Sequence, residues 1–204
     1  MTINQKVQDR IDGFPTGHVF MASDFNDLAD VNTIWQYLAR LEHQGRVSRI
    51  TRGTYYKPAF SKLIGEYEAP SIPETARALA HNYHWTIAPS GNTALNLLGL
   101  STQVPAKWTY ISDGPYRSYT IGNQVLEFRH RSNREISGLS EKSAMVVQAI
   151  RAIGQGRLSE QNINKIRGIL TDAERIALLK ETKNVAGWIY RYIKTICSED
   201  IDSV

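Results

Sequence analysis

The stretch from Ser23 to Lys57 constrains the fold of this chain more than any other part of its sequence. Two short helical patterns stand close together in it, and the second ends at Gly45. An alternating, basic strand pattern follows and turns at Arg52-Gly53. Helix, turn, helix and hairpin in this order are typical of a winged helix-turn-helix unit, whose most common use is to read DNA. Residues 1–60 are therefore predicted to form a DNA-binding domain.

The second helical pattern of this stretch is predicted to place its polar face on DNA. Ser23 is expected to cap the first helix, and the second is expected from Val31 to Gln44. The predicted buried stripe consists of Val31, Ile34, Leu38 and Leu41. The opposite face carries side chains that can contact base edges and phosphates, namely Asn32, Thr33, Gln36, Tyr37 and Arg40.

The hairpin that follows is basic and contains no acid. Its four cations are Arg46, Arg49, Arg52 and Lys57. An Arg at the tip of a hairpin suits contact with phosphates or with the minor groove. The alternative is that the helix-hairpin unit serves as a dimerisation module or as part of a larger core, in which case the polar helix face is only a solvated surface.

The rest of the chain is predicted to form a second domain over residues 71–204, after a linker at 58–70. A helix is expected from Ser71 to Asn82 and a buried strand at His84–Ile87, followed by strands at 108–111, 116–121 and 124–130. Helices are expected after Ser140, Ser159 and Thr171, with a break at 184–187. The predicted fold class is α+β, a winged helix-turn-helix domain followed by a mixed α+β domain that ends in a helical bundle.

Composition narrows the classes of function. The 204 residues contain one cysteine, Cys197, which excludes an intrachain disulfide and a Cys-rich zinc site. A cytoplasmic location is expected, and no apolar run is long enough to span a membrane. The net charge of +4 suits a polyanionic partner such as double-stranded DNA.

Candidate sites outside the first domain are few. Pro89-Ser90-Gly91-Asn92 is neither a P-loop nor a nucleophile elbow, and Ser90 is interpreted as a helix cap. We expect no catalytic residue, no metal site, no cofactor and no enzymatic activity. A second basic region contains Lys107, Arg117, Arg129, Arg131 and Arg134. It could extend a DNA footprint, bind RNA or be an ordinary solvated face.

Several motifs resemble the AbiEi-family antitoxins. RGTYYKP in the hairpin is similar to the family's wing signature, and PSGNTALNLLGLSTQVP, YISDGP and LEFRHRSNREI are similar to one branch of the family. The resemblance extends from about Val19 to Trp188. It implies a winged-helix domain joined to an AbiEi-type C-terminal domain, although the motif at Pro89–Pro105 has no chemical role that we can assign.

The resemblance also implies a function. The family's antitoxins belong to type IV toxin–antitoxin systems linked to phage defence; they repress their own operon and counter a nucleotidyltransferase-like toxin without a stable complex. By motif position, Asn32, Thr33, Gln36 and Arg40 would read the operator, and Arg49 and Arg52 would contact its backbone. An orphan transcriptional regulator and a protein-interaction module without a cognate toxin are the alternatives.

Overall fold

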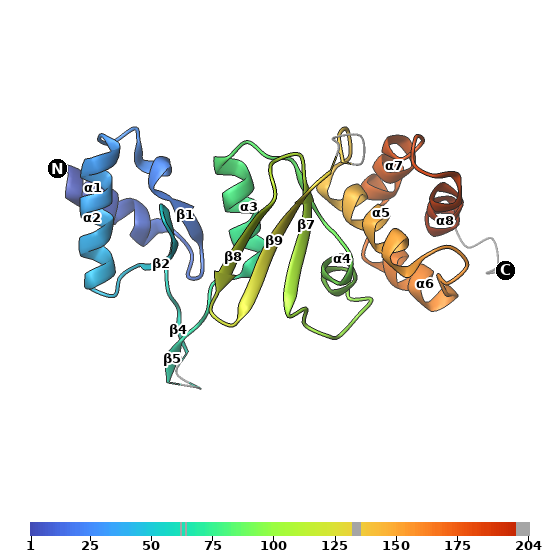
Figure 1. The fold of residues 1–204 in the computed structure, drawn as a ribbon, viewed down its shortest axis with the longest axis horizontal. Coiled ribbons are helices and arrows are strands. Elements are labelled where there is room, and N and C mark those ends of the chain that lie inside the picture. Colours follow the sequence, from blue (N-terminus) through green and yellow to red (C-terminus); the bar gives the residue numbers. More distant parts are fainter. Residues whose placement is uncertain (62, 64, 132–135, 199–204) are drawn as a thin grey trace. The chain divides into compact units, whose positions relative to one another are not determined.

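The computed structural model describes residues 1–61, 63, 65–131 and 136–198 (Figure 1). It is a mixed α+β structure, as predicted. The chain divides into two compact units, residues 1–85 with 119–123 and residues 86–118 with 124–204. In the described ranges, no helix has the length and apolar character needed to cross a membrane.

The first unit combines helices with a small antiparallel sheet. Its helices are α1 (Ile3–Gly13), the 3-10 turn η1 (Ala22–Phe25), α2 (Val31–His43) and α3 (Ile72–Asn82). Its strands are β1 (Val19–Met21), β2 (Ser48–Thr51), β3 (Thr54–Tyr56), β4 (Phe60–Ser61) and β5 (Glu66–Tyr67). The three-stranded sheet has the order β1-β3-β2, so that Tyr56 pairs with both Val19 and Ser48. Gly53 turns the chain between β2 and β3 with φ of +79°, a conformation that favours glycine.

The core of this unit forms on the apolar stripe of α2. Ile34, Leu38 and Leu41 are buried, as predicted. They pack with apolar and aromatic residues from the neighbouring elements, namely Val7, Ile11, Phe20, Ala22, Phe25, Val47 and Tyr55. Val31 was predicted to join the stripe but is 42% exposed. It is the first residue of the helix, where the helix extends past the core.

The first helix of the predicted motif is only a 3-10 turn. Ser23 lies inside this turn and is not its N-cap; its hydroxyl donates instead to Asn82 Oδ1 at 2.9 Å. Asp24 Oδ2 accepts the backbone N–H of Met21 at 2.8 Å. Asp30 is the N-cap of α2 and accepts the backbone N–H groups of residues 32 and 33. Asp24 and Asp30 therefore cap the backbone, whereas Asp27 forms an ion pair with Arg10 at 2.7 Å.

The linker and the start of the second domain differ from the sequence-based boundaries. Residues 58–70 contain the hairpin of β4 and β5. Helix α3 was predicted to open the second domain at residue 71, but it groups with the first unit, where it contacts β1. Its N-cap is Ser71, as predicted. The boundary between the two units falls between Trp85 and Thr86. Helix α3 belongs to the first unit because it packs against β1.

A four-stranded sheet belongs to the second unit except for residues 119–121 of one edge strand, which group with the first unit. The strands are β6 (Ile87–Pro89), β7 (Lys107–Ser112), β8 (Arg117–Ile121) and β9 (Gln124–His130), in the order β6-β7-β9-β8. Strands β6 and β7 are antiparallel, whereas β7 and β9 are parallel with Thr109 opposite Glu127. The predicted strand at His84–Ile87 begins only at Ile87, because His84 has φ of +54° and cannot continue a strand.

Four helices end the chain around a common core. They are α5 (Glu141–Ile153), α6 (Glu160–Gly168), α7 (Asp172–Glu181) and α8 (Gly187–Cys197). The predicted N-caps Ser140, Ser159 and Thr171 each accept a backbone N–H of the following helix. Helix α5 is buried without interruption from residue 143 to residue 150 and contacts α4 (Asn92–Leu97), β6, α7 and α8. This helix therefore joins the sheet to the other helices.

Candidate nucleic-acid interface

The exposed face of α2 carries three of the predicted base-reading side chains. Asn32, Gln36 and Arg40 are exposed and lie four residues apart, so they follow one side of the helix. The N-cap carboxylate of Asp30 lies at the start of this face, and hydrogen bonds from Thr33 and from the backbone hold its pKa below the usual value. Beyond this cap the face carries amides and cations, which can donate to base edges and to phosphates.

The other two predicted residues of α2 have structural roles. Thr33 is half-buried, and its hydroxyl donates to Asp30 Oδ2 at 2.6 Å. Tyr37 is half-buried against the core of the unit, and the guanidinium carbon of Arg40 lies 5.7 Å from the centroid of its ring. Tyr37 can therefore hold Arg40 in place, while Thr33 stabilises the start of the helix.

Trp35 joins the helix face to the hairpin, and the sequence analysis missed it. Its side chain is 38% exposed. The guanidinium carbon of Arg52, at the hairpin tip, lies 5.7 Å from the centroid of its indole ring. A large aromatic residue within a polar helix face was the signal that could have identified it. The contact places the hairpin cation beside the helix, so that both belong to one surface.

Two of the four predicted hairpin cations bind within the protein instead of facing outward. Arg46 forms an ion pair with Asp12 at 2.7 Å. Lys57 Nζ donates to the backbone carbonyls of Asp12 and Phe14, both at 2.7 Å. These contacts tie the end of α1 to the hairpin. Arg46 and Lys57 are therefore weaker candidates for DNA contact, because their charged groups already bind partners within the unit.

Arg49 and Arg52 are the two hairpin cations that remain at the surface. Both side chains are exposed. Arg49 Nε donates to the carbonyl of Thr51 at 3.3 Å, which keeps this side chain along its own strand. Of these two, Arg52 contacts α2, through its cation–π contact with Trp35 at 5.7 Å.

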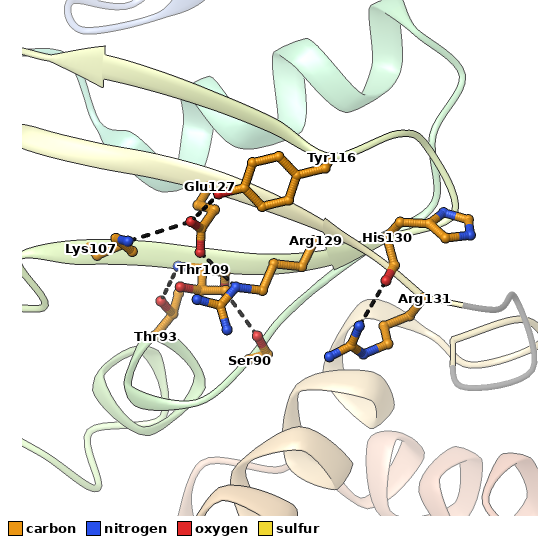
Figure 2. Close-up of polar contacts among 9 residues, drawn as sticks. All are labelled: Ser90, Thr93, Lys107, Thr109, Tyr116, Glu127, Arg129, His130 and Arg131. Carbon is orange, nitrogen blue, oxygen red and sulfur yellow. Dashed lines mark hydrogen bonds and ion pairs between the residues drawn. The ribbon is translucent and has the colours of Figure 1, made fainter.

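The second basic region centres on a buried carboxylate (Figure 2). Glu127 on β9 has a side chain that is only 4% exposed. Its Oε2 accepts Arg129 Nε at 2.6 Å, and its Oε1 accepts the Tyr116 hydroxyl at 2.6 Å and Lys107 Nζ at 3.5 Å. Three donors from β7, β9 and the turn before β8 thus meet on one carboxylate.

The same contacts fix the protonation states in this cluster. The hydrogen bond from Tyr116 is the largest cause that holds the pKa of Glu127 below its ordinary value, and the bond from Arg129 acts in the same direction. The pKa of Tyr116 is raised, chiefly because its hydroxyl donates to this carboxylate. At neutral pH the cluster therefore contains an ionised Glu127 and a protonated Tyr116.

The remaining predicted members of the basic region do not converge on Glu127. Arg117 is exposed on β8. Arg131 follows β9 directly, and its Nη1 donates to the carbonyl of His130 at 3.0 Å. Arg134 lies outside the described residues. The structure thus brings together Lys107 and Arg129, with Arg117 and Arg131 farther along the strands.

The motif at Pro89–Pro105 has structural contacts that explain part of its composition. Ser90 is not the cap of α4; Gly91 holds that position, and the Ser90 hydroxyl donates to the carbonyl of Thr109 at 3.4 Å. Thr93 Oγ1 accepts the backbone N–H of Thr109 at 2.8 Å (Figure 2). Ser90 and Thr93 therefore bind the backbone of Thr109 on β7. No group of three or more metal-ligating side chains occurs in the part of the chain that the structure describes.

Comparison with known proteins identifies a family without a known activity. The model of a family described as "Family of unknown function (DUF6088)" matches residues 6–178. No curated protein matches the sequence. Among solved structures, the crystal structure of the RV2827C protein from Mycobacterium tuberculosis is similar at 11% identity and a TM-score of 0.44, over 94% of this chain and 74% of that chain.

Proposed function

For this chain, which belongs to the DUF6088 family of unknown function, we propose sequence-specific binding of double-stranded DNA as its first activity. In this proposal the N-terminal unit is a winged helix-turn-helix in which α2 is the recognition helix and the turn between β2 and β3 is the wing. The order α1, β1, η1, α2, β2, β3 supports it, since a sheet with the order β1-β3-β2 closes behind the recognition helix. The four C-terminal helices form the helical bundle of the second domain.

The observation that carries this proposal is the joined surface of α2 and the hairpin tip. Arg52 stacks on Trp35, and Gln36 follows Trp35 directly on the helix. An α-helix fits the major groove, where an amide such as Gln36 can make two hydrogen bonds to adenine. A cation at the adjoining hairpin contacts backbone phosphate, which supplies affinity without sequence preference.

Two substitutions separate affinity from specificity. Arg52→Ala should weaken binding to every duplex and reduce the slope of log K against log salt by about 0.9, because one phosphate contact is lost. Gln36→Ala should instead remove discrimination at one base pair, worth about 1–3 kcal/mol. Both effects are measured by gel shift and fluorescence anisotropy on DNA from upstream of the chain's own gene, at several salt concentrations.

Matched controls keep this test specific. Arg191→Ala removes an exposed arginine from α8 in the other unit and should leave the affinity and the salt slope unchanged. Absence of protection of the upstream DNA at low salt would refute the repressor proposal. An unchanged base preference in Gln36→Ala would show that another face of the unit reads the operator.

We further propose that the protein represses its own operon and acts as the antitoxin of a type IV system. The support is the sequence resemblance of the hairpin and of the motifs within residues 89–136 to AbiEi-family antitoxins. The partner would be a nucleotidyltransferase-like toxin, countered without a stable complex. Within this proposal the second unit carries the antitoxin activity, and the N-terminal unit directs repression.

Co-expression tests this second activity separately from DNA binding. The chain, expressed from an unrelated promoter, should restore growth to cells that express the neighbouring nucleotidyltransferase-like gene, and Arg52→Ala should restore growth equally. Failure of the wild-type chain to restore growth would favour an orphan regulator. Co-purification of the two proteins as a stable complex would favour a protein-interaction module.

A further inference from the structure

The cations around Glu127 have hydrogen-bond donors that their contacts with Glu127 do not use. Arg129 donates to Glu127 through Nε, so the two Nη groups of its guanidinium lie outside this contact. The side chains of Arg129 and Lys107 are 48% and 53% exposed, whereas that of Glu127 is 4% exposed. The carboxylate is therefore covered by its own donors, and the cations form the outer surface.

The charges of the cluster leave it positive. One carboxylate faces the two cations Lys107 and Arg129, and both of its oxygens are engaged. Arg117 on β8 and Arg131 after β9 lie in the same part of the sequence and are exposed. Lys107 on β7 and Arg129 on β9 meet on one carboxylate and both are exposed, so the two cations can bind one backbone phosphate together.

Tyr116 adds an aromatic surface to these cations. It is 60% exposed, although its hydroxyl is held on Glu127 Oε1 at 2.6 Å. The hydrogen bond fixes the ring while its faces stay accessible, as Figure 2 shows for its position beside Glu127 and Arg129. An immobilised, exposed aromatic ring beside cations is the arrangement that binds unpaired bases by stacking.

We propose that the surface formed by Lys107, Tyr116 and Arg129 binds single-stranded nucleic acid. A base stacks on Tyr116, and the adjoining backbone phosphate is bound by Arg129 and Lys107, which Glu127 orients. A duplex is a poorer ligand, because its paired bases present no free face to the ring. This site lies wholly in the second unit and does not depend on the proposed binding of operator DNA by α2.

Fluorescence anisotropy with labelled twelve-nucleotide oligouridine and oligothymidine tests the proposal on the full chain. Tyr116→Ala should weaken binding by roughly 5- to 150-fold, the loss of one stacked base. Tyr116→Phe should retain most of the affinity, because the ring remains. Arg129→Gln should weaken binding and reduce the salt slope by about 0.7, the value for one phosphate contact on a single strand.

Controls in both units make the outcomes decisive. Arg191→Gln removes the same charge from α8 and should have no effect on single-strand binding. Arg52→Ala should also leave it intact, while Arg129→Gln should leave operator binding intact. If Arg191→Gln weakened single-strand binding as much as Arg129→Gln does, the effect would come from non-specific charge, and the proposal would be overturned. Loss of single-strand binding in Arg52→Ala would also overturn it, since α2 would then be the common site.

Two further ligands distinguish the source of the phosphate. Adenosine monophosphate should compete with the labelled oligonucleotide only at much higher concentration, because it offers one phosphate and one base. Competition by the mononucleotide at the same concentration as the oligonucleotide would identify a free-nucleotide site and overturn strand binding. Tighter binding of an unrelated duplex than of either single strand would overturn the proposal as well.

Discussion

Replacing Phe25 by alanine is expected to destabilise the N-terminal unit by about 3–5 kcal/mol, the usual cost of deleting a buried phenyl ring. The Phe25 side chain is fully buried in the core beneath α2. Its ring meets the rings of Phe20 and Phe14 edge to face, with centroids 5.7 and 6.4 Å away. The guanidinium carbon of Arg10 lies 5.5 Å from its centroid. Because domains are stable by only about 5–15 kcal/mol, this loss removes a large share of the total.

Urea denaturation followed by circular dichroism measures the change, and hydrogen exchange of the α2 peptides assigns it to this unit. Phe60→Ala is the matched control, because Phe60 is 56% exposed and contacts only the ring of Tyr67 among the aromatic residues that the structure describes. Its expected cost is about 1 kcal/mol or less. Equal costs for the two substitutions would contradict the core described for the first unit.

Ile150→Ala should have the second-largest effect, about 2–5 kcal/mol, on the other unit. Ile150 is fully buried on α5, the helix that contacts both the sheet and the later helices. Its removal leaves a cavity among residues of several elements, including Leu98, Ile166 and Ile193. Partial relaxation around such a cavity explains the spread of the expected cost.

Differential scanning calorimetry of the full chain measures this effect as a lowered Tm of the transition assigned to the second unit. Ile176→Ala is the matched control on α7, because Ile176 is 68% exposed. Its expected effect lies within about 0.5 kcal/mol, since alanine is also the better helix former. A similar loss of Tm in both variants would show that α5 is not the central helix of this core.

Helix starts in the C-terminal half could be predicted because their signals are local. Ser140, Ser159 and Thr171 each cap a helix within three residues, and Glu174 Oε2 accepts the backbone N–H of Thr171 at 2.8 Å. Ser90 shows the limit of the same rule. It precedes a helix, but its hydroxyl donates a hydrogen bond to the carbonyl of Thr109 on a neighbouring strand.

The sequence predicted which types of residue form the candidate site. It predicted less well which individual residues belong to it. Asn32, Gln36 and Arg40 follow from helical periodicity alone. Arg46 and Lys57 have the right charge at the right spacing, yet Asp12 and the end of α1 engage them. The stacking of Arg52 on Trp35 joins residues 17 positions apart, and no local pattern encodes such a contact.

The sequence by itself determined the α+β class, the N-caps of α3, α5, α6 and α7, the buried stripe of α2 at Ile34, Leu38 and Leu41, and the basic hairpin. These follow from propensity and periodicity over a few residues. Only the tertiary structure decided that α3 belongs to the first unit and that Glu127 gathers three donors. The physical reason is that the accessibility of a charge depends on the partners that the fold brings to it from distant parts of the chain.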